Sequence, residues 1–211
     1  MDYYGTKLAT CSSDKTIKIF ELQTNGQQIP IAELVGHEGP VWQLSWSHPK
    51  FGSLLASCSY DRKVIIWKEV SGKWTNIKEI NCHDASVNSV SWAPPEYGII
   101  LACASSDGSL SIISSTNDET WEPKKIINAH SSGCNAVSWC PPYSLESSSA
   151  GLCTKRLISG GCDNLLKIWK ENNNKDWEQE LQLEGHTDWI RDVAWTQSFG
   201  LLGNTIASCS Q

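Results

Sequence analysis

Short stretches in which apolar and polar residues alternate recur along the chain. Alternation with a period of two is typical of strands that bury one face. Each alternating stretch is followed by a more continuously apolar stretch, then by a tight turn that begins with aspartate, and then by a third apolar stretch. Aspartate, glycine and asparagine in such turns favour hairpins, so we predict repeated antiparallel strands. The first stretches are 41–46, 87–92 and 135–139, the second are 54–59, 100–106 and 156–161, and the third are 63–67, 109–113 and 165–169.

Histidine and tryptophan mark the length of this repeat. His37, His83, His130 and His186 are spaced by 46, 47 and 56 residues, and Asp14, Asp61, Asp107 and Asp163 keep nearly the same spacing. A tryptophan lies nine residues after each of these histidines, at positions 46, 92, 139 and 195. Another lies nine residues before the last three, at positions 74, 121 and 177, where a fourth strand begins. Four strands in a period of about 46 residues predict the blades of a β-propeller.

The repeat places the whole chain, residues 1–211, in one propeller domain of five units. Residues 37–82, 83–129 and 130–185 are expected to form complete blades, and residues 1–36 and 186–211 to form partial ones. The long third interval comes from a Ser- and Pro-rich insertion at 141–155, which we expect to be a surface loop. The sequence therefore predicts an all-β fold, an open propeller of four-stranded antiparallel blades that is truncated at both ends.

A histidine, a hydroxyl, an aspartate and a tryptophan recur at matching positions of the units. The histidine precedes the first strand, the hydroxyl lies on the second, the aspartate begins the turn and the indole lies on the third. These four groups can form one buried chain of hydrogen bonds. The sets are His37, Ser57, Asp61 and Trp67 in the second unit, and His130, Ser159, Asp163 and Trp169 in the fourth. In the third unit Cys103 and Ile113 replace the hydroxyl and the indole, so we expect His83 and Asp107 to pair without the rest of the chain.

Serine, histidine and aspartate together also resemble a hydrolase triad. An active site usually occurs once, whereas this set recurs from unit to unit, which favours a structural role. The sequence contains no GxSxG, P-loop or HExxH motif. We therefore predict no enzymatic activity, no catalytic or metal-binding residue and no cofactor.

The composition of the chain argues against several classes of ligand and location. The net charge is -6 and no cluster of Lys and Arg occurs, which argues against a nucleic-acid binder. The chain contains no run of about 20 apolar residues, the length that is needed to span a membrane. The first residues lack the apolar core of a signal peptide. The nine cysteines are odd in number and contain no CxxC pair, which argues against a metal site. Cys11, Cys58 and Cys209 share a Thr/Ser-Cys-Ser pattern that indicates buried thiols in a reducing compartment, and His48, outside the repeat pattern, is expected in an exposed loop.

The GH…D…W spacing, clearest from Gly36-His37 to Trp67, is similar to that of WD-repeat propellers. Longer stretches resemble one branch of that family, the small propeller subunits of the COPII outer coat, which are also subunits of the nuclear pore Y complex. A sister propeller of the nuclear pore is similar but matches these stretches less well. The stretches that carry the resemblance are 1–20, 36–69, 83–98, 133–139, 159–171 and 188–195.

This resemblance implies a non-enzymatic scaffold in ER-to-Golgi vesicle transport and in the nuclear pore. The propellers of this branch have six blades and are left open until an α-solenoid partner donates a further blade. The implied partners are the α-solenoid coat subunit of the COPII outer shell and a solenoid nucleoporin of the Y complex. The implied location is cytoplasmic and peripheral, through partners, at ER exit sites and COPII vesicles, at the nuclear pore, and at the lysosome or vacuole surface.

We expect the partner to meet an exposed edge of the first unit, at Thr10, Cys11, Ile17, Ile19 and Phe20. Two other binding functions remain compatible with the sequence. One is a generic WD-repeat adaptor, such as a ubiquitin-ligase substrate receptor, that uses the loops near Glu38, Asp84 and Asp188. The other is the sister propeller nucleoporin.

Overall fold

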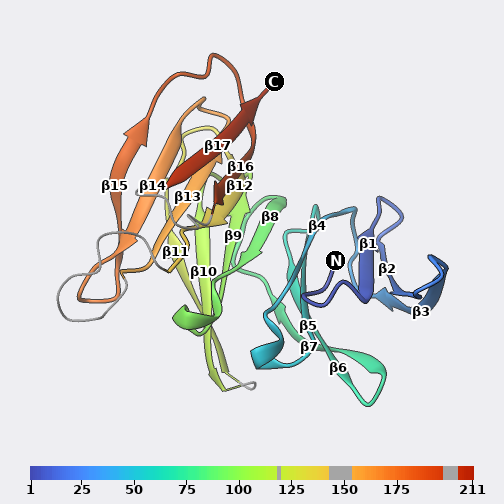
Figure 1. Cartoon of the computed structure of the whole chain (residues 1–211). Helices are drawn as coiled ribbons and strands as arrows, with labels where there is room; N and C mark the ends of the chain where they lie inside the picture. Colours follow the sequence, from blue (N-terminus) through green and yellow to red (C-terminus); the bar gives the residue numbers. More distant parts are fainter. Residues whose placement is uncertain (118–119, 143–153, 197–203) are drawn as a thin grey trace.

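Five antiparallel sheets stand side by side in the computed structural model, which describes residues 1–117, 120–142, 154–196 and 204–211 (Figure 1). Three of them, the second, third and fourth along the chain, have four strands. The first sheet has three strands and the fifth has two among the described residues. The prediction of an all-β, open propeller built from four-stranded antiparallel blades is confirmed.

The strands follow the chain in order within each sheet. The first sheet holds β1 (Lys7–Cys11), β2 (Thr16–Leu22) and β3 (Gln28–Val35). The second holds β4 (Val41–Trp46), β5 (Leu54–Ser59), β6 (Val64–Val70) and β7 (Lys73–Ile80). The third holds β8 (Val87–Trp92), β9 (Ile99–Ser105), β10 (Leu110–Asn117) and β11 (Thr120–Ile126). The fourth holds β12 (Cys134–Trp139), β13 (Arg156–Gly161), β14 (Leu166–Glu171) and β15 (Trp177–Leu183), and the fifth holds β16 (Ile190–Thr196) and β17 (Thr205–Ser210).

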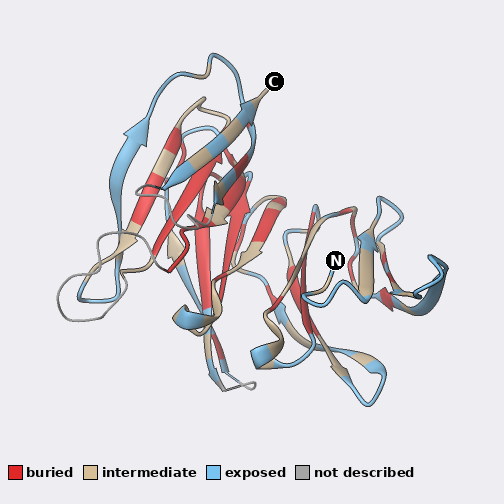
Figure 2. Cartoon of the chain, in the orientation of Figure 1, coloured by how far each residue is buried: buried red, intermediate tan, exposed pale blue. Residues whose placement is uncertain are grey.

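In the three four-stranded sheets, burial falls from the middle strands to the last strand (Figure 2). Every residue of β5 and of β13 is buried, whereas nearly all of β15 is exposed. The apolar residues of one sheet pack against those of the next, so the core consists of layers between neighbouring blades. This packing explains the pattern of the sequence, because a strand that is covered on both faces reads as continuously apolar rather than alternating.

The aspartate-led turns join the second and third strands of the three four-stranded sheets, and they join β1 and β2 in the first sheet. The residue after each aspartate has a positive φ, +73° at Lys15 and at Arg62, +79° at Gly108 and +66° at Asn164. The aspartate side chain accepts the amide hydrogen of the residue two positions on, as Asp61 does from Lys63 at 2.9 Å. Such a side-chain bond stabilises a turn that would otherwise be strained.

Several smaller expectations have mixed outcomes. Cys58 is buried and Cys11 is half-buried, but Cys209 is exposed because the two-stranded fifth sheet has no described neighbour over that face. His48 is half-buried rather than exposed; it begins a short 3-10 helix, Pro49–Phe51, and its ring meets that of Tyr3 with 4.8 Å between ring centroids. Residues 143–153, most of the expected insertion, lie outside the described residues.

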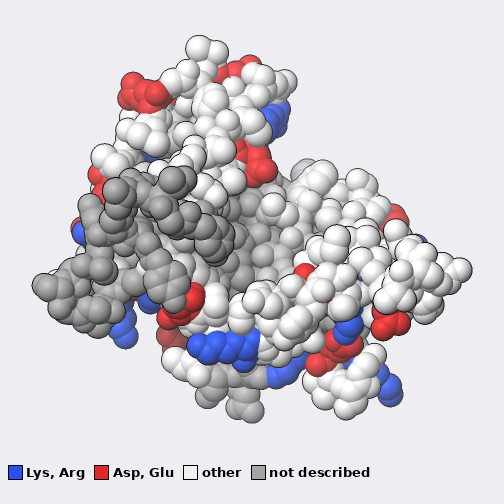
Figure 3. Space-filling view, in the orientation of Figure 1, with Lys and Arg blue, Asp and Glu red and all other residues white. Residues whose placement is uncertain are grey.

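Charged side chains of both signs are interspersed on the face shown in Figure 3, and they do not gather into one basic patch there. No helix in the described ranges is long and apolar enough to cross a membrane. Within the same ranges, no group of three or more His, Cys, Asp or Glu residues is arranged to hold a metal ion.

Candidate functional site

The second sheet contains a closed chain of four side chains. His37 Nδ1 lies 2.9 Å from an Asp61 carboxylate oxygen, and His37 Nε2 lies 2.8 Å from Ser57 Oγ. The indole Nε1 of Trp67 donates to the same Ser57 oxygen at 2.9 Å. The imidazole therefore donates from Nδ1 and accepts the serine hydroxyl hydrogen at Nε2, so every polar atom of the chain has a partner.

The fourth sheet repeats this geometry with different residues. His130 lies 2.8 Å from Asp163 and 2.8 Å from Ser159, and Trp169 donates to Ser159 at 2.9 Å. The structure thus brings together all eight of the residues that the sequence assigns to the two complete tetrads.

The third sheet departs from the prediction. His83 Nδ1 does lie 3.1 Å from Asp107, but His83 Nε2 also lies 2.9 Å from Ser111 Oγ, so the pair is not alone. Ser111 on β10 is the register partner of Cys103 on β9. The hydroxyl that His83 binds therefore comes from β10 rather than from the usual position on β9. The expectation that His83 and Asp107 form an isolated pair is wrong, because it considered only the usual position of the hydroxyl.

Electrostatics supports a neutral ring beside an ionised carboxylate. Burial lowers the pKa of His37 and outweighs the hydrogen bond and the charge of Asp61, which act to raise it. Burial acts to raise the pKa of Asp61, but the amides of Glu38 and Lys63 and the bond from His37 outweigh burial and hold that pKa below its ordinary value. Near neutral pH the pair is therefore a neutral imidazole and a carboxylate.

The tetrads cannot act as hydrolase triads in this arrangement. Ser57 and Ser159 are fully buried, with 0% exposure, and each serine oxygen already accepts an indole hydrogen. A nucleophile needs a free approach to its substrate. The geometry therefore assigns these residues to the stability of the blades.

Side chains also link the first strand of the third sheet to that of the second, and the first strand of the fourth sheet to that of the third. The indole of Trp92 donates to the Ser45 carbonyl and that of Trp139 donates to the Ser91 carbonyl, both at 2.9 Å. Among the described residues no acceptor meets the buried Nε1 of Trp195. Trp92 and Trp139 thus bind their own blade to the preceding blade, a role that their spacing alone did not indicate.

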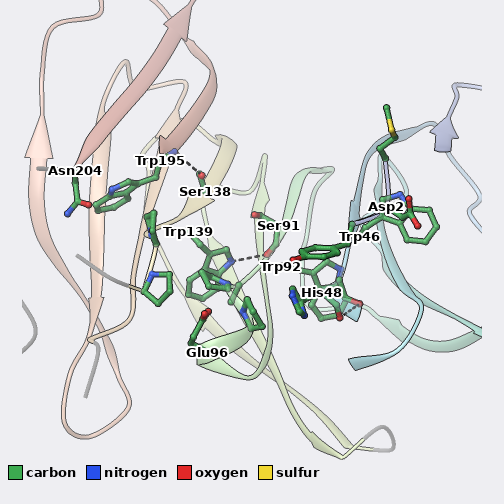
Figure 4. Close-up of a pocket in the computed structure, with 18 residues that line it drawn as sticks. Asp2, Trp46, His48, Ser91, Trp92, Glu96, Ser138, Trp139, Trp195 and Asn204 are labelled. Atoms are coloured by element: carbon green, nitrogen blue, oxygen red, sulfur yellow. Dashed lines mark hydrogen bonds between the residues drawn. The ribbon is translucent and has the colours of Figure 1, made fainter. Parts of the chain in front are cut away.

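The four tryptophans that follow the repeat histidines converge on one cavity. Trp46, Trp92, Trp139 and Trp195 all line a space of about 670 Å³ and are drawn around it in Figure 4. The first three meet a second marker tryptophan of their own sheet edge to face, as Trp46 meets Trp74 with 5.6 Å between ring centroids. Only the assembled arrangement of blades brings residues so distant in sequence to one place.

The first sheet presents one face to the second sheet, and no hydrophobic cluster of the described residues covers its other face. Ile17 and Ile19 have 0% exposure and pack with residues of the second sheet, and Cys11 lies on the same face. Thr10 is exposed and Phe20 is half-buried, and both lie on the opposite face. Since side chains alternate along a strand, Thr10 and Phe20 lie on the face away from the second sheet, and Cys11, Ile17 and Ile19 lie on the face toward it. The expected partner edge stays a prediction.

Fold, tetrads and blade contacts together define a WD-repeat propeller. The family model described as WD domain, G-beta repeat, matches residues 1–21, 28–68, 74–114, 121–170 and 177–211. Curated relatives refine this class, and they include the SEC13 homologs of Homo sapiens, Drosophila melanogaster and Dictyostelium discoideum, with 59%, 53% and 58% identity over the whole chain. The chain belongs to the SEC13 family of WD-repeat proteins.

The relatives are longer than this chain. It spans 61% of the length of the Drosophila protein, 67% of the human protein and 71% of the Dictyostelium protein. A relative from Candida albicans, 53% identical and spanned to 72%, is named Protein transport protein SEC13.

Proposed function

We propose that this chain is a non-enzymatic scaffold in protein transport, acting in the COPII vesicle coat between the ER and the Golgi. The names of its relatives support a transport role. The mechanism that we propose is strand addition to the first sheet, in which β1 has no hydrogen-bonded neighbour other than β2 among the described residues. An exposed strand edge binds another chain by adding a strand to the sheet.

The open face of the first sheet supports the proposed docking. On this face, Leu8 of β1 lies directly opposite Phe20 of β2, and Thr10 of β1 lies opposite Lys18 of β2. The face therefore carries an apolar cross-strand pair next to a polar one. The apolar pair provides area that an incoming blade can bury, and burial contributes about 25 cal/mol per Å². The proposed partner is the α-solenoid coat subunit, which would donate a blade to this side.

The proposal extends to the nuclear pore, where a solenoid nucleoporin of the Y complex would occupy the same side. The chain would reach membranes only through such partners, at ER exit sites and vesicles, at the nuclear pore, and at the surface of the lysosome or vacuole. Its compartment would be the cytoplasm.

Capture of purified α-solenoid coat subunit by the whole chain tests the proposal. We expect Phe20→Asp to lower the affinity at least tenfold, because a carboxylate would replace apolar area on the open face. Val70→Asp is the matched control, since Val70 is an exposed apolar residue, 55% exposed, on the second sheet. Circular dichroism verifies that both variants keep their strands.

Equal capture by wild type and Phe20→Asp would reject this docking face. Failure to capture any solenoid partner, together with capture of a ligase adaptor through the loops near Glu38 and Asp84, would favour the adaptor function instead.

A further inference from the structure

The cavity in which four tryptophans converge is lined by charged groups of one sign. Its wall includes the tryptophans at or near the ends of β4, β8, β12 and β16, and its volume is about 670 Å³ (Figure 4). Asp2 and Glu96 line it, whereas no Lys or Arg belongs to the lining among the described residues. The face of an aromatic ring carries partial negative charge and attracts cations. Both the rings and the carboxylates therefore favour a positively charged ligand.

The Glu96 carboxylate is the acidic group of the lining that is free to bind a cation. Glu96 lies in the short 3-10 helix Pro95–Tyr97, is exposed, and makes no hydrogen bond or ion pair with the described residues. Its side chain is directed toward the ring of Trp139 (Figure 4). The Asp2 carboxylate, by contrast, accepts two backbone amide hydrogens of its own loop, at 2.7 and 2.9 Å. Glu96 can therefore supply a counter-ion beside an aromatic wall.

The second sheet carries the opposite charge at the equivalent position, and that charge is already engaged. Lys50 lies four residues after the tryptophan of its repeat, as Glu96 does in the next repeat. The Lys50 Nζ donates to the Pro95 carbonyl at 3.5 Å and lies 5.6 Å from the centroid of the Phe51 ring. His48, which lines the cavity, accepts the Lys50 amide hydrogen at Nδ1, at 3.1 Å, so this nitrogen carries no hydrogen. These contacts leave Glu96 unpaired.

A guanidinium group suits this lining better than an ammonium group does. A guanidinium is planar and weakly hydrated, stacks on aromatic faces, and binds a carboxylate through two parallel hydrogen bonds. An ammonium is compact and strongly hydrated, so it gives up more when it leaves water. The indole N–H groups of Trp92 and Trp139 already donate to backbone carbonyls. A ligand therefore meets these rings through their carbon atoms, as a stacked guanidinium does.

We propose that this cavity is a binding site for an arginine side chain, which a partner protein presents on an exposed segment of its chain. The guanidinium group lies against the indole rings and pairs with the Glu96 carboxylate. The cavity volume of about 670 Å³ lies within the range of roughly 300–1,000 Å³ that is usual for ligand sites. Leu8, Thr10 and Phe20, which form the face used by the proposed function, do not line this cavity, so the inference goes beyond that function.

Nuclear magnetic resonance of the whole ¹⁵N-labelled chain tests this inference. The probe is the synthetic peptide Gly-Gly-Arg-Gly-Gly with both ends blocked. We expect saturable shifts of the indole N–H signals of Trp92 and Trp139, and an unmoved signal of Trp42, which lies near the other end of its strand, β4. The same peptide with citrulline in place of arginine keeps the shape of the side chain and loses its charge. It should bind at least about tenfold more weakly.

A pair of variants separates this site from general attraction to a chain of net charge -6. Glu96→Gln keeps the shape of the side chain, removes the counter-ion, and should weaken binding of the arginine peptide at least about fivefold. The matched control is Glu178→Gln, which changes the net charge equally at an exposed position of β15 and should bind the peptide as the wild type does. Circular dichroism verifies that both variants keep their strands.

Three results would overturn the site. They are equal binding of the arginine and citrulline peptides, an equal loss of affinity in Glu96→Gln and Glu178→Gln, and indole signals of Trp92 and Trp139 that do not move at saturation. Preference for arginine that is lost in Glu96→Gln and kept in Glu178→Gln would support it.

Discussion

Two substitutions in the third sheet can transfer the hydroxyl that binds His83 from position 111 on β10 to position 103 on β9. Ser111 on β10 serves His83 because Cys103 occupies the position at which the second and fourth sheets carry serine. We expect Ser111→Ala to destabilise the chain, and we expect Cys103→Ser, added to it, to restore most of the loss. The serine would then approach His83 as Ser57 approaches its own histidine, at 2.8 Å.

The magnitude follows from burial. Ser111 and Cys103 have 0% exposure and His83 has 7%, so water cannot replace a lost hydroxyl. Leaving the His83 Nε2 without a donor is unfavourable by about 1–3 kcal/mol. The Cys103 thiol is a poor substitute, because burial raises its pKa and keeps it neutral, and a neutral S–H is a weak donor.

Urea denaturation followed by tryptophan fluorescence measures the effect. Ser111→Ala should lower the free energy of unfolding by about 1–3 kcal/mol with an unchanged dependence on urea concentration, and the double variant should recover at least half of that loss. Ser53→Ala, which removes an exposed hydroxyl, is the control. A Ser111→Ala variant as stable as the control, or a double variant no more stable than the single one, would refute the idea that either strand can supply the hydroxyl.

Three further outcomes are expected. Burial lowers the pKa values of His37, His83 and His130 in the folded chain, so the unfolded chain binds more protons as the solution becomes acidic. The urea concentration at the midpoint of unfolding should therefore decrease when the pH is lowered from about 7.5 to about 5.5. An unchanged or higher midpoint at the lower pH would contradict this. Trp169→Phe removes one buried indole donor and should lower the free energy of unfolding by about 1 kcal/mol, whereas Trp42→Phe, at an exposed site, should leave the melting temperature nearly unchanged. Gly161→Ala places a methyl group against the His130 ring and should destabilise the chain by about 2 kcal/mol or more. The comparison is Gly26→Ala, which meets nothing within 4 Å and is strained only by its φ of +82°; it should cost less, and equal melting temperatures would contradict the clash.

The periodic part of the fold could be predicted because local chemistry repeats with it. The strand β4 was expected at 41–46 and occupies Val41–Trp46, since alternation and the following turn both mark it. The members of the two complete tetrads were predictable for the same reason, because each sits at a fixed place relative to a turn. Ser111 was not, since a cross-strand neighbour has no fixed position in a linear pattern.

Which face of a strand meets a neighbour could not be predicted from alternation alone. Ile17 and Ile19 share one face of β2, while Phe20 lies on the other. Both faces carry apolar residues, so the sequence does not state which one the second sheet covers. The convergence of the marker tryptophans on one cavity was missed for a related reason, because it depends on how the blades are arranged around it.

The bonds between neighbouring blades have a direction that suits synthesis on the ribosome. Trp92 and Trp139 each donate backward, to the carbonyls of Ser45 and Ser91 on the first strand of the preceding sheet. As the chain emerges from its amino end, the acceptor for each new tryptophan is therefore already present in a completed blade. A chain held on the ribosome can then fix one blade at a time, and a substitution in an early blade should delay every blade made after it.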